Sequence, residues 1–261
     1  MTDPLLVSID DGLAHLTLNR PERLNAFNAD LARAWEKATV DITSRSDVGA
    51  ILIDGAGPGF CAGGDVVDMA TTMGSPSDLE ELAHTINRGI RALTESSIPV
   101  VAAVHGVTAG GGLGVLLSSD YVVAAAGARI GSRYANIGLT PDLSVTAQLS
   151  RAVGTRRALQ LVLSDRMLTA EEAQCWGLVA EVVRGEGYAT RAHAVARSWL
   201  DGAASAYGEA KRLIRSSCSR SFADQLDEEA RTIAASFGTD EARDRINAFL
   251  QAKTDRATRG S

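Results

Sequence analysis

Two clusters of glycine could do chemistry through the backbone. One spans residues 55–66 and the other residues 105–114, and each contains five of the 25 glycines of the chain. Each follows an apolar run typical of a buried strand, Ala50–Ile53 or Pro99–Val104, and leads into a predicted helix. Such a turn leaves backbone N–H groups unpaired at the helix start, where the helix dipole favours negative charge. The clusters therefore indicate sites at which the backbone meets an anionic group.

Nucleotide-binding and nucleophile motifs do not account for the clusters. The second cluster does not read G-x-G-x-x-G, and it lacks the Lys-Ser/Thr ending of a P-loop. The chain contains no G-x-S-x-G nucleophile elbow. The alternative is that the glycines only permit tight turns for close packing. Two clusters about 47 residues apart, each after a buried strand, weaken that alternative.

The elements that must position the clusters alternate between strand and helix in the first half of the chain. Leu5–Ile9 and Leu13–Leu18 predict a hairpin. Residues 28–43 predict an amphipathic helix with Asn28 as its N-cap, and Tyr121–Ala125 predicts a further strand. This alternation is typical of an α/β core.

The second half of the chain is mostly helical in pattern. Before it, Ser77 and Glu80 predict a capping box at the start of a helix that follows the first cluster. After about residue 142, only Leu178–Val183 is predicted to be extended, and the last long helix is expected to break near Gly238. We expect residues 1–195 to form the core and residues 196–261 to form a helical region.

Composition and charge exclude several classes of protein. Hydrophobic residues make up 45% and charged residues 22% of the 261, as in an ordinary globular protein. A net charge of −6 without a Lys/Arg block argues against nucleic-acid binding, and no apolar run is long enough to span a bilayer. Cys61, Cys175 and Cys218 form no CxxC pair, and no cluster has metal-ligand spacing. We expect a reduced, cytoplasmic protein without a metal, a membrane partner or a nucleic-acid partner.

Several segments together resemble the enoyl-CoA hydratase/isomerase (crotonase) superfamily. They are LNRPERLNAF at 18–27, FCAGGD at 60–65, Gly106 with GGG at 110–112, the stretch 137–151, and the stretch 168–179. The resemblance covers about residues 5–253 and is closest to the enoyl-CoA and epoxyphenylacetyl-CoA isomerase branch. It implies a crotonase-type spiral of ββα units, with residues 196–261 as a C-terminal helical trimerisation region. It also implies a homotrimer or a dimer of trimers.

The resemblance places an oxyanion hole at the backbone N–H groups of Gly64 and Gly111. A CoA thioester that loses or gains a proton at carbon places negative charge on its carbonyl oxygen. Two preorganised donors in a dry site stabilise that charge, and removing one donor typically costs about 3 kcal/mol. Coenzyme A would enter as part of the substrate, and no cofactor would be bound permanently.

Further residues correspond to positions that line the family's CoA and acyl channel. They are Arg23, Leu24, Ala26, Ala62, Gly63, Asp65, Val66, Gly110 and Tyr134, with Phe249 and Lys253 from the last helix of a neighbouring subunit. Arg20 and Arg23 would offer positive charge to phosphates. Asp65 also fits the N-cap of a helix.

The residues of hydratase chemistry are missing at the matching positions. The resemblance puts the two hydratase glutamates at Gly114 and Tyr134, and neither is a carboxylate. Hydration needs a group that polarises water and returns a proton. Glycine cannot do this, and tyrosine, with a pKa near 10, is poorly suited to it. We therefore expect chemistry other than ordinary hydration.

Asp142 offers a different carboxylate. Its segment, IGLTPD at 137–142, resembles segments of ring-opening epoxyphenylacetyl-CoA isomerases, in which the aspartate faces the acyl chain. One carboxylate suffices to move a double bond, because it can remove a proton at one carbon and return it two carbons away. Burial would raise its pKa toward the useful range. The competing interpretation is that Asp142 only caps the next helix after Pro141.

Three alternatives to an enoyl-CoA isomerase stay open. The first is a hydratase with unusual acid/base residues, and the second is a catalytically silent acyl-CoA-binding protein. The third is dehalogenase-like chemistry with Asp142 as nucleophile, which needs a histidine base near Asn87 or Arg88. His84 lies about one turn earlier, and a partly exposed helix histidine is its simpler interpretation. His105, before Gly106, is interpreted as structural.

Overall fold

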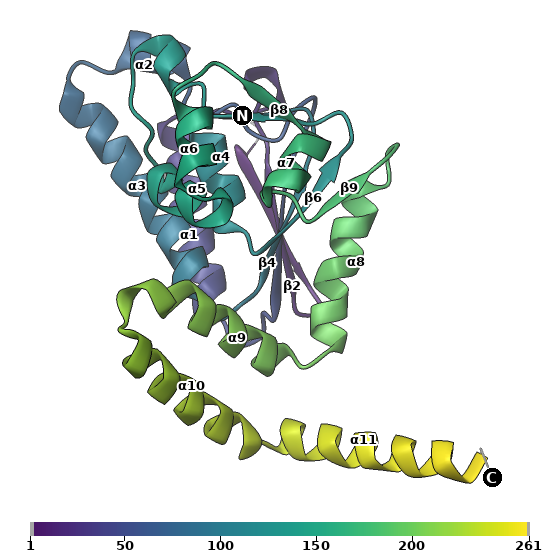
Figure 1. Cartoon of the computed structure of the whole chain (residues 1–261). Coiled ribbons are helices and arrows are strands. Elements are labelled where there is room, and N and C mark those ends of the chain that lie inside the picture. The colour runs from purple at the N-terminus through teal and green to yellow at the C-terminus, as the bar shows by residue number, and fades with distance from the viewer. Residues whose placement is uncertain (1–2, 260–261) are drawn as a thin grey trace.

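A computed structural model describes residues 3–259, with side chains as far as Lys253 (Figure 1). Within that range a six-stranded sheet has the order β1-β2-β3-β4-β6-β9. Its strands are β1 Leu5–Asp10, β2 Leu13–Leu18, β3 Ala50–Gly55, β4 Val100–Val104, β6 Tyr121–Ala125 and β9 Glu181–Val183. β1 and β2 form the predicted antiparallel hairpin, and the other neighbouring strands are parallel. The sheet therefore brings the carboxyl ends of β3 and β4, where the glycine clusters begin, to one edge.

Helices cover both faces of this sheet. The helices of the described residues are α1 Ala29–Ser44, α2 Val66–Thr72, α3 Pro76–Glu95, α4 Gly111–Ser118, α5 Val145–Val153, α6 Thr155–Val162, α7 Ala170–Trp176, α8 Tyr188–Asp201, α9 Ala204–Ser216, α10 Phe222–Phe237 and α11 Asp240–Arg259, with short 3₁₀ turns η1 Pro21–Arg23, η2 Tyr134–Ile137 and η3 Ser217–Ser219, and the last two α-helices lie beyond the sheet. Ile51 and Ile53 pack in the core cluster that includes α1 and α3, whereas Ala50 and Leu52 pack against α8 (Figure 1). Burial on both faces explains why β3 and β4 appear as continuous apolar runs.

The helix starts follow local capping chemistry. Asn28 caps α1 as predicted, because its side chain accepts a hydrogen bond from the Leu31 N–H at 3.0 Å. The capping box predicted at Ser77 and Glu80 is wrong by two residues. The box is formed by Ser75 and Asp78, whose carboxylate accepts from the Ser75 N–H at 2.9 Å. Pro76 explains the shift, since its fixed φ suits the first helical position.

A second, smaller sheet is the main element that the sequence pattern did not indicate. It contains β5 Val107–Ala109, β7 Arg129–Gly131 and β8 Met167–Thr169 in that order. β8 lies in the half of the chain where only Leu178–Val183 was expected to be extended, so that expectation is wrong. Strands of three residues are too short for a period of two to be visible. Thr108 of β5 also forms an isolated β-bridge with Cys61, and this bridge joins the two glycine clusters.

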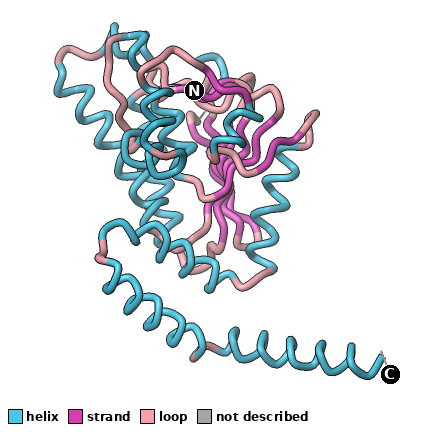
Figure 2. The backbone as a smooth tube through the Cα atoms, in the orientation of Figure 1, coloured by secondary structure: helices cyan, strands magenta, loops and turns pink. Residues whose placement is uncertain are grey.

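The last helices lead away from the sheet. Figures 1 and 2 show α9 beside the core and α10 and α11 extending beyond it. The predicted break near Gly238 is confirmed, because α10 ends at Phe237 and α11 begins at Asp240. Phe222, Phe237 and Phe249 are 81%, 73% and 70% exposed. Within residues 3–259, no helix combines the length and the apolar composition that crossing a membrane requires.

A buried lysine attaches α9 to the core. Lys211 Nζ donates to the carbonyl oxygens of Leu93 at 2.8 Å and Ile98 at 2.6 Å, and it pairs with Asp120 at 3.0 Å. Lys211→Met is expected to lower the free energy of unfolding by about 3 kcal/mol, because it leaves two carbonyl acceptors unpaired and removes one of the two cations that pair with Asp120, the other being Arg215. Urea denaturation of the variant and the parent protein measures the difference.

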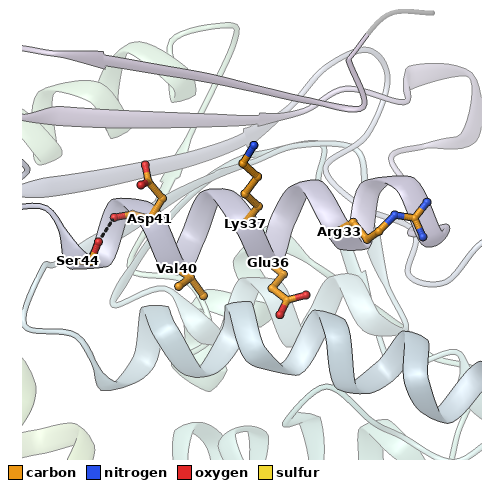
Figure 3. A pocket seen from close by; sticks show the side chains of 6 residues that line it. All are labelled: Arg33, Glu36, Lys37, Val40, Asp41 and Ser44. Atoms are coloured by element: carbon orange, nitrogen blue, oxygen red, sulfur yellow. Dashed lines mark hydrogen bonds between the residues drawn. The ribbon is translucent and has the colours of Figure 1, made fainter.

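Lys37 provides the matched control. It is exposed on α1, and Figure 3 shows its side chain extending on the opposite side from Glu36, which pairs with Arg88 of α3. Lys37→Met is expected to change the free energy of unfolding by less than about 0.5 kcal/mol. Equal urea midpoints for the Lys211 and Lys37 variants would show that Lys211 does not hold α9 in place.

Candidate active site

A cavity of about 490 Å³ lies where the two glycine clusters meet α2, α3 and the segment 133–143. Its apolar walls include Val66, Met69, Leu79, Leu82, Ala83, Ile86, Ile137, Leu139 and Leu143. Its polar lining includes the backbone of Gly64, Gly110 and Gly111, together with Tyr134 and Asp142. The cavity is thus largely apolar, with a few convergent polar groups, as is typical of ligand sites.

Asn25 holds the first glycine cluster in shape. Its side chain donates to the carbonyl oxygens of Ala56 at 2.9 Å and Gly59 at 2.8 Å, and it accepts from the Arg20 N–H. Phe27 then bridges the cluster, because its N–H donates to Gly63 and its carbonyl accepts from Asp65. Gly64 lies between the two bonded residues, and its N–H donates to neither side of the bridge.

The second cluster opens α4 with uncapped N–H groups. Gly110 occupies the N-cap position with φ 52°, and no side chain caps the helix there. Gly111 is the first residue of α4. A Cβ on Gly63, whose φ is 104°, would lie 2.9 Å from the Gly111 nitrogen. Only glycine therefore lets the two clusters approach so closely.

Gly64 and Gly111 thus present donors in one place. Neither backbone N–H donates to a backbone acceptor among the described residues, and both residues line the cavity. Gly111 adds the positive end of the α4 dipole. A carbonyl oxygen that gains negative charge would find two backbone donors at this point.

Asp142 lies in the same cavity and is not a helix cap. α5 begins at Val145, and Ser144 occupies its N-cap position, so the capping interpretation of Asp142 is wrong. The Tyr134 hydroxyl donates to Asp142 Oδ1 at 2.6 Å. Burial raises the pKa of Asp142, in the direction expected from the sequence, although the Tyr134 hydrogen bond acts against it. The folded chain therefore holds the Asp142 proton to a higher pH than an exposed aspartate would.

Leu143 closes the space beside Gly114. A Cβ on Gly114 would lie 2.8 Å from Leu143 Cβ and closer still to the Leu143 carbonyl oxygen. Leu143 and Ser144 have φ of 48° and 66°, a conformation that non-glycine residues rarely adopt. The chain thus turns sharply after Asp142 and leaves no room for a side chain at position 114.

Several residues assigned to the CoA channel lie beside the cavity without lining it. Arg20 does not face solvent as a phosphate ligand, because it pairs with Asp65 at 3.0 Å and is only 15% exposed. Asp65 caps α2 by accepting from the Asp68 N–H at 3.1 Å. Burial alone would raise the pKa of Asp65, but the bonds from Asp68 and Arg20 outweigh it and lower the pKa. Arg23 is exposed and has no side-chain hydrogen bond within residues 3–253.

The remaining predicted residues divide between the cavity and its surroundings. Ala62, Val66, Gly110 and Tyr134 line the cavity, together with Gly64, Gly111 and Asp142. Leu24, Ala26 and Gly63 lie in the adjoining segments, where the Leu24 carbonyl accepts from the Ala62 N–H at 2.9 Å. Phe249 and Lys253 do not reach this cavity within one chain, since they are exposed on α11.

Other titratable groups are poorly placed for chemistry. Glu80 lines the cavity from α3, but its side chain is 73% exposed, and His84 beside it is 59% exposed. His105 Nε2 contacts the Gly57 carbonyl oxygen at 2.8 Å and is structural, as expected. Burial raises the pKa of the Cys61 thiol to about 12, so it stays protonated. Within the described part of the chain, no three His, Cys, Asp or Glu side chains are arranged to hold a metal ion.

Sequence reasoning missed most of the apolar wall. Leu79, Leu82 and Ile86 repeat at helical spacing, which is typical of a core face, and Leu82 and Ile86 belong both to the core and to the cavity wall. The spacing cannot distinguish a face that packs on a core from one that lines a cavity. Met69 carries no pattern at all, yet its methyl group lies against Gly64.

Comparison with known proteins shows one family over nearly the whole chain. The family described as enoyl-CoA hydratase/isomerase matches residues 8–256. The chain belongs to the enoyl-CoA hydratase/isomerase family. Members of this family act on acyl-CoA thioesters, so the cavity with Gly64 and Gly111 is a candidate site for such a thioester.

Some relatives are named as isomerases and others as hydratases. The chain is 32% identical to the 1,2-epoxyphenylacetyl-CoA isomerase of Escherichia coli, over 99% of each chain. It is 30% identical to a probable enoyl-CoA hydratase of Mycobacterium tuberculosis, over 98% of each chain. A crystal structure of a putative enoyl-CoA hydratase from Streptomyces coelicolor superposes with a TM-score of 0.90 at 29% identity, covering 95% of this chain and 92% of that one. The predicted crotonase fold is thus confirmed.

Proposed function

We propose that this family member is an enoyl-CoA isomerase that moves a carbon–carbon double bond in the acyl group of a CoA thioester. The observation that carries the proposal is the position of Asp142. It is a partly buried carboxylate with a raised pKa, in the same cavity as the uncommitted N–H groups of Gly64 and Gly111. No other carboxylate among the described residues lines that cavity except the exposed Glu80.

The proposed reaction needs one base and one oxyanion site. Ionised Asp142 removes a proton from the carbon next to the thioester carbonyl of a 3-enoyl substrate. The electron pair of that C–H bond moves into a dienolate, whose oxygen accepts hydrogen bonds from the Gly64 and Gly111 N–H groups. Asp142 then returns the proton two carbons away, and the double bond moves to the 2-position. The base ends the cycle ionised, so no other reactant is required.

Hydration is the alternative that the relatives' names keep open. Against it, position 114 lacks space for a carboxylate beside Leu143, and Tyr134 uses its proton in the bond to Asp142. The raised pKa of Tyr134, which follows first from burial and then from the charge of Asp142, also opposes its use as a base. These features support an isomerase over a hydratase.

We further propose that the CoA site is completed by a second copy of the chain. Phe249 and Lys253 are exposed on α11, far from the cavity of their own chain, so a contact with CoA would require a neighbouring subunit. The exposed Phe222 and Phe237 of α10 support an interface there, because large exposed apolar groups mark interaction surfaces. A homotrimer or a dimer of trimers in the cytoplasm is the assembly we expect.

A panel of CoA thioesters tests the proposal. The purified protein is incubated with 3-enoyl-CoA and 2-enoyl-CoA of several chain lengths. Conjugated 2-enoyl product is followed by ultraviolet absorbance, and addition of water is followed by mass spectrometry. Conversion of 3-enoyl to 2-enoyl-CoA without hydration supports the isomerase. Hydration at ordinary enzymic rates would establish the hydratase, and calorimetric binding without turnover would establish a silent acyl-CoA-binding protein.

A further inference from the structure

The proposed base lies in a segment without regular structure. η2 ends at Ile137 and α5 begins at Val145, and between them Leu139 and Thr140 are exposed. A catalytic carboxylate has to be held in a fixed direction, and a loop does this only when its side chain is fixed by neighbours. Some contact must therefore orient Asp142.

Tyr134 provides that contact. Its hydroxyl, 2.6 Å from Oδ1, is the only side-chain group that hydrogen-bonds the Asp142 carboxylate among the described residues. Tyr134 is itself well fixed, since it is only 8% exposed and follows the end of β7 by three residues. Between them, the Ser132 carbonyl accepts from the Gly110 N–H at 2.9 Å, which ties this segment to the second glycine cluster.

We propose that Tyr134 is a positioning residue for Asp142, holding Oδ1 so that Oδ2 is the oxygen that exchanges the proton with substrate. The proposal rests on the proposed function of Asp142 as the base. It replaces the expectation that Tyr134 is a simple substrate contact. Burial and the negative neighbour both raise the pKa of Tyr134, so its hydroxyl remains a donor throughout the pH range of an assay.

Tyr134→Phe tests the proposal through the pH profile. A hydrogen bond to the ionised carboxylate favours the charged form, so its loss raises the pKa of Asp142 further. The acid limb of kcat is expected to move to higher pH by about one unit, as for one hydrogen bond to a charged group. The kcat at its plateau is expected to fall about tenfold through misorientation of the base, while KM changes less than about twofold.

Tyr121→Phe is the matched control. The Tyr121 hydroxyl donates to Glu181 Oε1 at the same distance, 2.6 Å, but neither residue lines the cavity. The control is expected to leave the pH profile and kcat as in the parent protein. A Tyr134→Phe variant with a raised KM and an unmoved acid limb would overturn the proposal in favour of a substrate contact.

A titration separates this proposal from the proposed function. Carbon-13 NMR of protein labelled at aspartate Cγ, with the Asp142 signal assigned by its loss in Asp142→Asn, reports the pKa of that carboxyl whatever the reaction. A higher pKa in Tyr134→Phe than in the parent protein is expected. An unchanged pKa overturns the positioning role. A shifted pKa in a protein that isomerises no thioester would instead overturn the isomerase proposal alone.

Discussion

Asp142→Asn is expected to lower kcat for double-bond migration by about 10²- to 10⁴-fold with little change in KM, because a positioned acid/base group contributes about that much to a rate. The asparagine has nearly the shape of the aspartate, and its amide oxygen can still accept the hydrogen bond that Tyr134 donates. The cavity and the donors at Gly64 and Gly111 should therefore persist. Steady-state kinetics with 3-enoyl-CoA measures the effect.

The same substitution is expected to leave the protein at least as stable near neutral pH. Burial raises the pKa of Asp142 in the folded chain, so the folded state binds more protons than the unfolded state between the two pKa values. Stability therefore falls as pH rises through that window, and the ionised carboxylate disfavours folding above it. An asparagine carries no such cost, so lost activity could not be attributed to unfolding. Thermal denaturation at pH 7 checks this point.

Glu80→Gln identifies the base among the carboxylates of the cavity. Its side chain is 73% exposed, so water surrounds its carboxylate and does not hold it in the fixed direction that catalysis at carbon needs. If Glu80→Gln abolished turnover and Asp142→Asn retained it, the assignment of Asp142 as the base would be wrong. The acid limb of the pH profile should also be absent in the Asp142→Asn variant and present in the Glu80→Gln variant.

The sequence was sufficient for the features that depend on local chemistry. Burial explains the apolar runs of β3 and β4, and the need for backbone freedom explains the glycines at 63–64 and 110–112. Both features could be predicted from residue type and spacing. The position of Asp142 could be proposed only through the family resemblance, because its neighbours in sequence do not show whether it is a cap or a base.

The features that the sequence did not indicate arise from tertiary geometry. Leu143 and Ser144 adopt positive φ although neither is a glycine or an asparagine, the residue types that would predict it. This turn directs Asp142 away from the start of α5. The hydrogen bond from Tyr134 spans eight residues and depends on η2, whose start was not visible in the pattern. Local propensity does not encode such contacts, because the surrounding structure imposes them.

The turn at Leu143 leads to the second large prediction, which concerns Gly114. Gly114→Glu is expected to lower the free energy of unfolding by at least about 3 kcal/mol and to confer no hydratase activity. A Cβ at this position lies 2.8 Å from Leu143 Cβ and closer still to the Leu143 carbonyl oxygen, so the backbone after Asp142 must move. A glutamate there would also place a charge among fully buried residues of α4.

Gly114→Ala separates the steric part of this effect from the charge. Position 114 lies inside α4, where helix propensity alone would make alanine more stable than glycine by about 1 kcal/mol. The contact with Leu143 is expected to reverse that sign, because it involves backbone atoms that cannot rotate away. A destabilised alanine variant would therefore show that the steric contact outweighs propensity.

Gly127→Glu is the control for introducing a glutamate. A Cβ at Gly127 meets nothing within 4 Å, and the residue is exposed, so its stability should match the parent protein within about 0.5 kcal/mol. Urea denaturation of all three variants, with crotonyl-CoA hydration assayed beside it, gives the comparison. A stable Gly114→Glu protein that hydrates crotonyl-CoA would mean that the segment around Leu143 is movable. In that case the parent protein would lack hydratase activity because position 114 has no carboxylate, and not because the space there is closed.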